Sequence, residues 1–231
     1  MPEPITAPVA EIFSSIQGEG IYIGARQIFV RFCGCNLRCA YCDEKAAVSS
    51  GNPATVPAVM DEILRLDAQE KHHSVSLTGG EPLLRSKFIR ELAPLIKKAG
   101  LLVYLETNAT LPAAYAEIAE HVDIVAADIK FSTCGTDTHK AHLDFLSLCR
   151  GKAFVKAVLC GTESDAELKS CVDIMTAAGK GMPLVIQPVT PRAGEPSCNQ
   201  NRVDLLRSLA QNNSIRHVAV LHQMHPVWGL R

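Results

Sequence analysis

The apolar residues of the chain follow two alternating patterns, and their alternation predicts the fold class. Short β-rich runs, such as Arg26–Phe32, are separated by longer stretches in which apolar residues recur at helical spacing. Strands that alternate with helices favour a parallel sheet with right-handed crossovers. The predicted strands are Val9–Phe13, Arg26–Phe32, Val75–Leu77, Leu101–Leu105, Val122–Ala127, Ala153–Leu159, Leu184–Ile186 and His217–Leu221.

Helices are expected between these strands, and two segments are expected to be loops. The loops are Gly51–Pro57 and Thr190–Pro196, which are rich in turn-forming residues. No internal repeat or low-complexity stretch interrupts the pattern, so residues 1–231 are expected to form a single domain. The predicted helices are Val56–Leu64, Phe88–Ile96, Pro112–Glu120, Lys140–Cys149, Asp165–Ala178 and Val203–Gln211.

Periodicity does not distinguish an open, doubly wound sheet from a barrel, but the placement of polar residues does. Polar groups follow strand after strand, at the carboxyl end of each. In a barrel these ends surround one cavity, so the pattern favours a barrel mouth. The segments are Thr78-Gly79-Gly80-Glu81, Glu106-Thr107-Asn108, Asp128-Ile129-Lys130, Gln187 and His222-Gln223-Met224-His225.

Composition and charge limit the kinds of molecule that the chain is expected to bind. The chain has 231 residues, 47% of them hydrophobic, and its 23 Lys and Arg against 24 Asp and Glu give a net charge of -1. Without a basic run, a nucleic acid is not expected as a direct partner. The sequence shows no leader-like segment and no apolar run of the roughly 18 residues that span a membrane, which predicts a soluble, cytoplasmic protein.

Cysteine usage indicates a metal site. Four of the nine cysteines fall within ten residues, beginning at Cys33. Clustering of this kind favours metal ligation over disulfides. Cys33 is interpreted as a packing residue on its strand. The remaining cysteines have no partner at ligand spacing and are expected to be small buried hydrophobes: Cys134, Cys149, Cys160, Cys171 and Cys198.

Cys35, Cys39 and Cys42 have the spacing C-x3-C-x2-C in a loop directly after a strand. Three thiolates can hold three irons of a [4Fe–4S] cluster and leave the fourth iron open to an outside ligand. Zinc is the main alternative, with His72 or His73 as a fourth ligand. A redox pair formed by Cys39 and Cys42 leaves Cys35 unexplained.

The cysteine loop, with Tyr41 before its last cysteine, resembles that of the radical S-adenosylmethionine superfamily. Thr78-Gly79-Gly80-Glu81-Pro82 resembles the glycine-rich segment of the same superfamily, in which the backbone approaches the cofactor closely. The resemblance implies a partial parallel β/α barrel, a [4Fe–4S] cluster and S-adenosylmethionine. It also implies that Tyr41 packs near the adenine and that Glu81 accepts from the methionyl ammonium.

Further segments resemble the 7-carboxy-7-deazaguanine synthase family over nearly the whole chain. These are Glu11–Gly20, Arg26–Asp43, Leu105–Asn108, Asp128–Lys130, Gln187-Pro188 and His222–His225. The resemblance implies a ring-contracting lyase of queuosine and deazapurine biosynthesis. Such an enzyme converts 6-carboxy-5,6,7,8-tetrahydropterin to 7-carboxy-7-deazaguanine, with loss of ammonia. An external electron donor such as a flavodoxin or ferredoxin is implied, and a homodimer is expected.

The resemblance also implies roles for individual residues. Substrate contacts are expected from Gln17, Glu19, Arg31, Thr78, Gln187 and His225, and cofactor contacts from Tyr41, Gly80, Glu81, Glu106, Asn108 and Lys130. Glu106 and Gln187 fit either ligand. His222, Gln223 and His225 are expected to close the mouth of the barrel, within a C-terminal segment at about 222–231.

The charge of Arg31 supports its assignment, because a guanidinium in the run Phe29–Phe32 is costly to bury without an anion. The anion is expected to be the substrate carboxylate, with an ion pair to Asp or Glu as the alternative.

One position departs from the family pattern. Glu44, in the cluster loop at about 33–45, stands where the family usually has a threonine that helps to hold Mg²⁺. A carboxylate is also a hard oxygen ligand, so Glu44 is a candidate Mg²⁺ ligand. It could equally replace the ion through a salt bridge with Lys45, which leaves the Mg²⁺ requirement open.

Two other functions fit part of the pattern. A glycyl-radical activase, or another small radical enzyme, shares the cysteine loop but needs an open groove for a protein partner. A zinc-stabilised binding module predicts a colourless protein that contains zinc and no cluster.

Overall fold

The structure is a computed structural model that describes residues 4–42, 50–135, 137–149, 151–179, 181–190 and 198–230. These residues form a nine-stranded sheet in the order β3-β1-β2-β4-β5-β6-β7-β8-β9. β1 pairs antiparallel with β2 and β3, and every later pairing is parallel. The sheet curves without closing, because β3 and β9 form its two edges. The prediction of a partial barrel is therefore confirmed.

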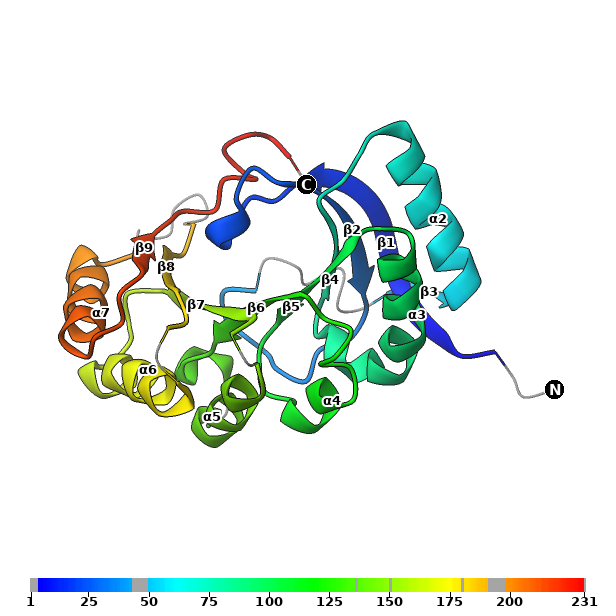
Figure 1. Cartoon of the computed structure of the whole chain (residues 1–231). Coiled ribbons are helices and arrows are strands. Elements are labelled where there is room, and N and C mark those ends of the chain that lie inside the picture. Colours follow the sequence, from blue (N-terminus) through cyan, green and yellow to red (C-terminus); the bar gives the residue numbers. More distant parts are fainter. Residues whose placement is uncertain are drawn as a thin grey trace.

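The strands are β1 (Thr6–Ile16), β2 (Arg26–Phe32), β3 (Asn52–Thr55), β4 (Ser74–Gly79), β5 (Leu102–Thr107), β6 (Ile124–Ile129), β7 (Ala153–Leu159), β8 (Leu184–Pro188) and β9 (Val218–Val220). The α-helices are α2 (Val56–Gln69), α3 (Ser86–Lys98), α4 (Pro112–Ala116), α5 (His139–Leu148), α6 (Asp165–Ala178) and α7 (Gln200–Asn212). Short 3₁₀ turns are η1 (Gly20–Tyr22), η2 (Pro82–Arg85) and η3 (Ser132–Cys134). Figure 1 shows the helices on the outer face of the curved sheet. None of the described helices combines the length and apolarity needed to cross a membrane.

The prediction of a loop at Gly51–Pro57 is wrong. Residues 52–55 form β3, which pairs with the first residues of β1, and α2 begins at Val56. Pro53 is tolerated because β3 is an edge strand, where a missing N–H costs little. A pairing partner far away in the sequence thus overrides the local turn preference. The helix expected at Pro112–Glu120 ends earlier, at Ala116, and the loop expected at Thr190–Pro196 lies outside the described residues after Thr190.

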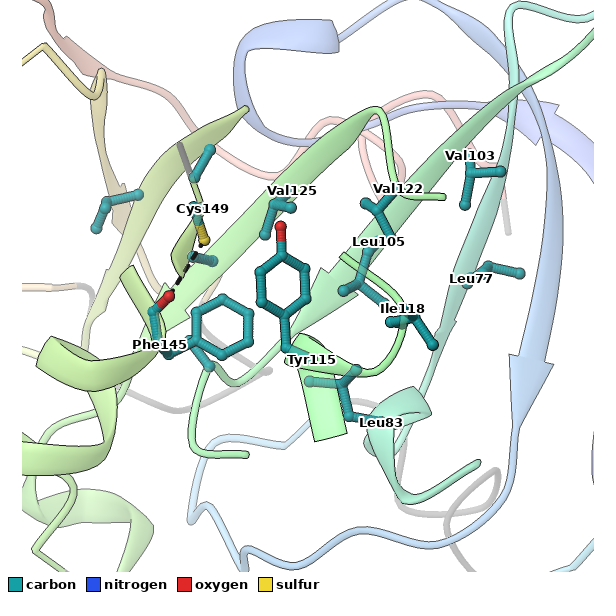
Figure 2. Packing of buried hydrophobic residues seen from close by; sticks show 14 of the residues in the cluster. Leu77, Leu83, Val103, Leu105, Tyr115, Ile118, Val122, Val125, Phe145 and Cys149 are labelled. Atoms are coloured by element: carbon teal, nitrogen blue, oxygen red, sulfur yellow. Dashed lines mark hydrogen bonds between the residues drawn. The ribbon is translucent and has the colours of Figure 1, made fainter. Parts of the chain in front are cut away.

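Side chains on alternate strand positions point to opposite faces of the sheet, and the outward ones form the main core. Val103 and Leu105 of β5 belong to the large cluster between sheet and helices. Figure 2 shows Tyr115 of α4 and Phe145 of α5 beside the outward side chains of the strands, and their ring centroids are 4.6 Å apart. Burial of these side chains holds the helices against the sheet.

The inner face carries a smaller apolar cluster of Tyr104, Ile124, Ala126, Phe154 and Val185, with Tyr22 and Leu221 packed against it. Gly20 lies directly over the Phe154 ring, where a Cβ atom would approach a ring carbon to 2.6 Å. Figure 1 shows the C-terminal segment beside the loop that joins β1 to β2, and the Met224 N–H donates to the Gly18 carbonyl at 2.9 Å. These two segments cover part of the inner face.

Most of the scattered cysteines have the expected position. Cys33, Cys134, Cys149 and Cys171 are buried, which confirms them as packing residues. Cys160 and Cys198 are partly exposed, so the expectation of burial is not met at these two positions. Both lie in loops at the carboxyl end of the sheet, where packing is looser than between strands and helices.

Candidate functional site

A cavity of about 460 Å³ opens on the inner face at the carboxyl ends of the strands. The alternation that sends Val103 and Leu105 outward sends Glu106 inward, and the same alternation turns Lys156 of β7 to the inner face. Fourteen of the predicted site residues line this cavity together: Gln17, Glu19, Arg31, Cys35, Cys39, Tyr41, Cys42, Thr78, Gly80, Glu106, Asn108, Lys130, Gln187 and His225.

The cysteine loop lies at one side of the cavity. Cys35, Cys39 and Cys42 are each partly exposed and all line the cavity. The Leu37 N–H donates to Cys35 Sγ at 3.4 Å. Burial raises the pKa of the Cys39 thiol to about 11. Because iron binds the thiolate, assembly of a cluster on these residues would release protons.

The glycine-rich segment packs directly against the cysteine loop. A Cβ atom at Gly80 would lie 2.1 Å from the Gly34 carbonyl oxygen and 3.0 Å from Cys35 Cβ. No side chain fits in that space, so the backbone of the glycine segment approaches the cysteine loop as closely as it does because position 80 is glycine.

The donor set fits an iron–sulfur cluster better than a structural zinc ion. His72 and His73 precede β4 and therefore lie at the opposite end of the strand from the cysteine loop. His72 Nε2 is 2.8 Å from Ser14 Oγ. Among the described residues no three His, Cys, Asp or Glu side chains are gathered closely enough to hold a single ion. Three thiols beside an open cavity suit a cluster that leaves one iron accessible.

Lys130 and Asp128 form an ion pair beside the cysteines, and Lys130 also lies over the ring of Tyr41. Lys130 Nζ lies 5.3 Å from the centroid of the Tyr41 ring and donates to Asp128 Oδ2 at 2.7 Å. Burial would lower the pKa of Lys130, but the Asp128 carboxylate holds this pKa above its ordinary value. The other oxygen, Asp128 Oδ1, is buried and has no hydrogen-bond partner within the described part of the chain.

Glu81, the acidic residue of the glycine-rich segment, lies behind the cavity wall. Its side chain is fully buried, away from the cavity lining. It accepts hydrogen bonds from Thr107 Oγ1 at 2.8 Å, from the Asn108 N–H at 2.8 Å and from the Leu83 N–H at 3.0 Å. Burial raises the pKa of Glu81 to about 7. Glu81 therefore anchors the backbone around Asn108, and its expected contact with the methionyl ammonium stays a prediction.

Gln17 and Glu106 meet in a buried hydrogen-bond network on the inner face. Gln17 Nε2 donates to Gln27 Oε1 at 3.0 Å and to Glu106 Oε1 at 2.9 Å. Glu106 also accepts from Ser76 Oγ at 2.8 Å and from Thr78 Oγ1 at 3.2 Å. The hydroxyl and amide donors hold the Glu106 carboxylate in one orientation at the cavity wall.

Arg31 forms the ion pair with an acidic side chain that was the alternative expectation for this residue. Its Nε donates to Glu11 Oε1 at 2.9 Å, and its guanidinium carbon lies 5.5 Å from the centroid of the Phe13 ring. The side chain also lines the cavity. The ion pair with Glu11 therefore positions a guanidinium at the cavity wall.

Gln187 carries a buried acceptor into the cavity. It follows Ile186 in β8, is 1% exposed and lines the cavity. Its Oε1 has no hydrogen-bond partner among the described residues. A buried acceptor without a donor costs free energy, so this position suits a ligand N–H or O–H group.

Glu19 is held by a lysine that was not among the predicted site residues. Lys156 donates to Glu19 Oε2, and Gln223 Nε2 donates to Glu19 Oε1 at 2.6 Å. Burial alone would raise the pKa of Glu19, but Lys156 and Gln223 lower it to about 2. The signal for Lys156 was present in the sequence, because a lone charge interrupts the apolar run of β7 just as Arg31 interrupts that of β2.

The expected closing segment is partly in place. Gln223 and His225 line the cavity, whereas His222 is exposed and lies outside the lining. Glu44, the candidate Mg²⁺ ligand, and its neighbour Lys45 lie outside the described residues.

Known proteins match this chain over most of its length. Residues 29–176 match the Radical SAM superfamily. A 7-carboxy-7-deazaguanine synthase of Geobacter sulfurreducens is 39% identical over 211 residues, which are 82% of this chain and 84% of that protein. A 7-carboxy-7-deazaguanine synthase of Methanothermobacter thermautotrophicus is 36% identical over 97% of this chain and 98% of its own length. These relatives do not favour a glycyl-radical activase or a binding module.

Solved structures share the fold. QueE from Escherichia coli has a TM-score of 0.63 at 19% identity, covering 94% of both chains. TYW1 with a lysine-pyruvate adduct bound has a TM-score of 0.59 at 16% identity, covering 80% of this chain and 73% of that one.

Proposed function

Because the chain belongs to the 7-carboxy-7-deazaguanine synthase family of the radical S-adenosylmethionine superfamily, we propose that its cavity converts 6-carboxy-5,6,7,8-tetrahydropterin to 7-carboxy-7-deazaguanine with loss of ammonia. The observation that carries the proposal is the single cavity in which three cysteine thiols face inward polar side chains from six parallel strands of the described sheet, β2, β4, β5, β6, β7 and β8. A cavity of about 460 Å³ suits small molecules.

The cofactor side is formed by the cysteine loop and its neighbours. Cys35, Cys39 and Cys42 would hold a [4Fe–4S] cluster, and Tyr41, Gly80, Asn108 and Lys130 would contact S-adenosylmethionine. When bound, these groups supply a 5′-deoxyadenosyl radical that removes a hydrogen atom from the substrate. Asn108 Nδ2 donates to Asn36 Oδ1 at 2.9 Å, which ties the end of β5 to the cysteine loop. Lys130 places a cation over the Tyr41 ring.

The substrate side is formed by the remaining lining residues. The ionised Glu19 carboxylate offers acceptors to the amino and ring N–H donors of a pterin, and Gln187 Oε1 offers a further acceptor. Arg31 supplies the cation for the substrate carboxylate. Gln17 and Thr78 set the orientation of Glu106, which we assign to either ligand.

The C-terminal segment covers the substrate and limits access of water. Gln223 bonds Glu19, and the backbone of Met224 bonds Gly18. Both contacts join the segment to the loop that carries Gln17 and Glu19. His225 would then close the cavity on the substrate side.

Five further features belong to the proposal. Residues 1–231 form one domain, and Glu44 either holds Mg²⁺ directly or makes the ion unnecessary. A homodimer covers an open sheet edge, and a flavodoxin or ferredoxin supplies the electron. The product would feed queuosine synthesis and hence tRNA modification.

The test is anaerobic reconstitution with iron and sulfide, reduction, and incubation with S-adenosylmethionine and the pterin. Mass spectrometry should detect 7-carboxy-7-deazaguanine, and the product should disappear when Cys35, Cys39 or Cys42 becomes Ala. Assays with and without Mg²⁺, repeated on Glu44→Thr, address the ion. Formation of 5′-deoxyadenosine with intact pterin would overturn the substrate assignment.

A further inference from the structure

Lys156 occupies a position between the two halves of the site. It lies in β7 opposite Asp128 of β6, and its ammonium group is 3.7 Å from Asp128 Oδ2 while it also donates to Glu19. Only 14% of its side chain is exposed. Asp128 in turn pairs with Lys130 on the cofactor side. Lys156 thus connects a carboxylate of the substrate side with a carboxylate of the cofactor side.

We propose that Lys156 is a positioning residue for substrate recognition, which keeps the Glu19 carboxylate ionised and directed into the cavity. The inference rests on the proposed function, because Glu19 acts as the acceptor for the donor edge of the pterin. It assigns a role to a side chain that has no place among the expected contacts of the site.

Burial makes the lysine necessary. The Glu19 side chain is only 17% exposed, and a buried carboxylate without a cation takes up a proton rather than remain charged. The protonated form carries an O–H donor and loses acceptor capacity, so it no longer matches two N–H donors. Gln223 donates one hydrogen bond but carries no charge.

The other charged and titratable groups around the pair do not replace Lys156. Tyr104 and Glu106 lie on β5, two strands away from β7, and Asp128 is a further carboxylate that Lys156 itself helps to balance. His225 interacts favourably with Glu19, but its contribution to the pKa of Glu19 is smaller than that of Lys156. Loss of the lysine therefore leaves Glu19 among more negative than positive neighbours.

The test measures substrate binding rather than turnover. The pterin is titrated into the reconstituted holoenzyme with S-adenosylmethionine but without a reductant, so that no reaction follows, and Kd is measured by calorimetry from pH 6 to 9. The variants are Lys156→Met, Lys156→Arg, Glu19→Gln and the double variant Glu19→Gln with Lys156→Met. Lys140→Met is the matched control, because Lys140 pairs with Asp144 on the exposed surface of α5.

Lys156→Met should weaken binding about tenfold or more at pH 7, because the ionised fraction of Glu19 falls about tenfold for each unit by which its pKa exceeds the pH. Its affinity should recover relative to wild type as the pH rises and Glu19 ionises. Lys156→Arg should restore binding to within about threefold. In the Glu19→Gln background, Lys156→Met should cause little further loss, because the lysine acts through Glu19.

Wild-type affinity for the pterin in Lys156→Met would overturn the inference. So would an equal loss of affinity when Lys156→Met is made in the wild type and in Glu19→Gln. If Lys156→Met does not fold, comparison of Glu19→Gln with the double variant still decides, because the double variant removes both members of the Lys156–Glu19 pair, and a further loss of affinity on removing the lysine would contradict the inference. Failure of the wild-type holoenzyme to make 7-carboxy-7-deazaguanine would contradict the proposed function instead, and is recognised in the separate turnover assay.

Discussion

The side-chain amide of Gln17 donates a 2.9 Å hydrogen bond to Glu106 Oε1, although the two residues are 89 positions apart in the sequence. The bond joins the loop after β1 to the end of β5, and it leaves the side-chain oxygen Gln17 Oε1 to accept from the Glu19 N–H at 3.1 Å. One amide therefore orients two carboxylate-bearing positions of the cavity. We therefore expect Gln17 to act on the substrate through these neighbours as well as by direct contact.

Replacing Gln17 should lower activity without removing the cluster. Gln17→Leu keeps the volume of the side chain but leaves Glu106 with fewer donors, so we expect kcat/KM to fall roughly 10- to 100-fold, about 1.5–3 kcal/mol. Gln69→Leu on the exposed end of α2 is the control. Steady-state kinetics on the reconstituted protein provide the measurement, and unchanged kcat/KM would show that Glu106 does not need this donor.

Gly18 should be intolerant of any side chain because the C-terminal segment packs against it. A Cβ atom at Gly18 would lie 2.7 Å from His225 N and 2.8 Å from His225 Cβ. Gly18→Ala should therefore displace the segment and raise KM for the pterin, while cleavage of S-adenosylmethionine continues. Limited proteolysis near residue 225 should become faster.

Gly24→Ala is the matched control in the same loop. Its Cβ atom would meet nothing within 4 Å, but the φ of +91° at this position strains any other residue, so we expect only a stability loss of about 1 kcal/mol. Equal effects of the two variants on KM would mean that loop strain, not the clash with His225, is responsible.

Cys33 should be dispensable for the cluster although it lies two residues before Cys35. It is 5% exposed, lies outside the cavity lining, and its Sγ would be 2.3 Å from a Cβ atom at Gly51. Cys33→Ala should keep the full iron and sulfide content and lose about 1 kcal/mol of stability from the small void. Cys35→Ala should lose the cluster absorption. Loss of iron in Cys33→Ala would place this thiol among the ligands.

His142 should make stability depend on pH. Burial lowers its pKa from 6.5 to about 4, and its Nε2 lies 3.0 Å from the Asn108 carbonyl. Because the unfolded chain takes up the proton first, the contribution is fully present above pH 6.5 and is lost as the pH falls towards 4, by up to about 3 kcal/mol.

Urea unfolding between pH 7 and 4 measures this effect. His142→Gln retains an amide near the Asn108 carbonyl but does not titrate, so its stability should fall less steeply with decreasing pH than that of the wild type. His217→Gln, at an exposed position, should follow the wild-type curve. Identical slopes in all three proteins would show that His142 does not carry the effect.

Local sequence patterns predicted most of the strands and helices. The alternation of apolar runs gave β2 and β4 to β9 within a few residues, because strands buried on both faces need continuous apolar residues. The segment Gly51–Pro57 was mistaken for a loop, since β3 is stabilised by its pairing with β1 and not by its own composition. β1 was predicted too short because Ser14 and Ser15 end its apolar run before the strand itself ends at Ile16.

In the candidate site too, local patterns predicted part of the arrangement and long-range contacts decided the rest. Motifs and spacing selected fourteen residues that share one cavity. Glu81 belongs to the glycine-rich motif, but its carboxylate oxygens accept hydrogen bonds from Thr107 and from backbone N–H groups. A linear motif does not reveal these contacts. Lys156 was missed because no motif contains it, and only the pleat of β7 and the fold of the loop before β2 bring it to Glu19.

The sequence by itself therefore determined the order of strands and helices and the family, and it selected the candidate cysteine ligands, because each depends on residues close together in the chain or on a motif. The tertiary structure alone decided how charges are paired inside the cavity. Lys156 and Glu19 are 137 positions apart, and burial makes their pairing matter, since a charge removed from water must find its partner wherever the fold places one.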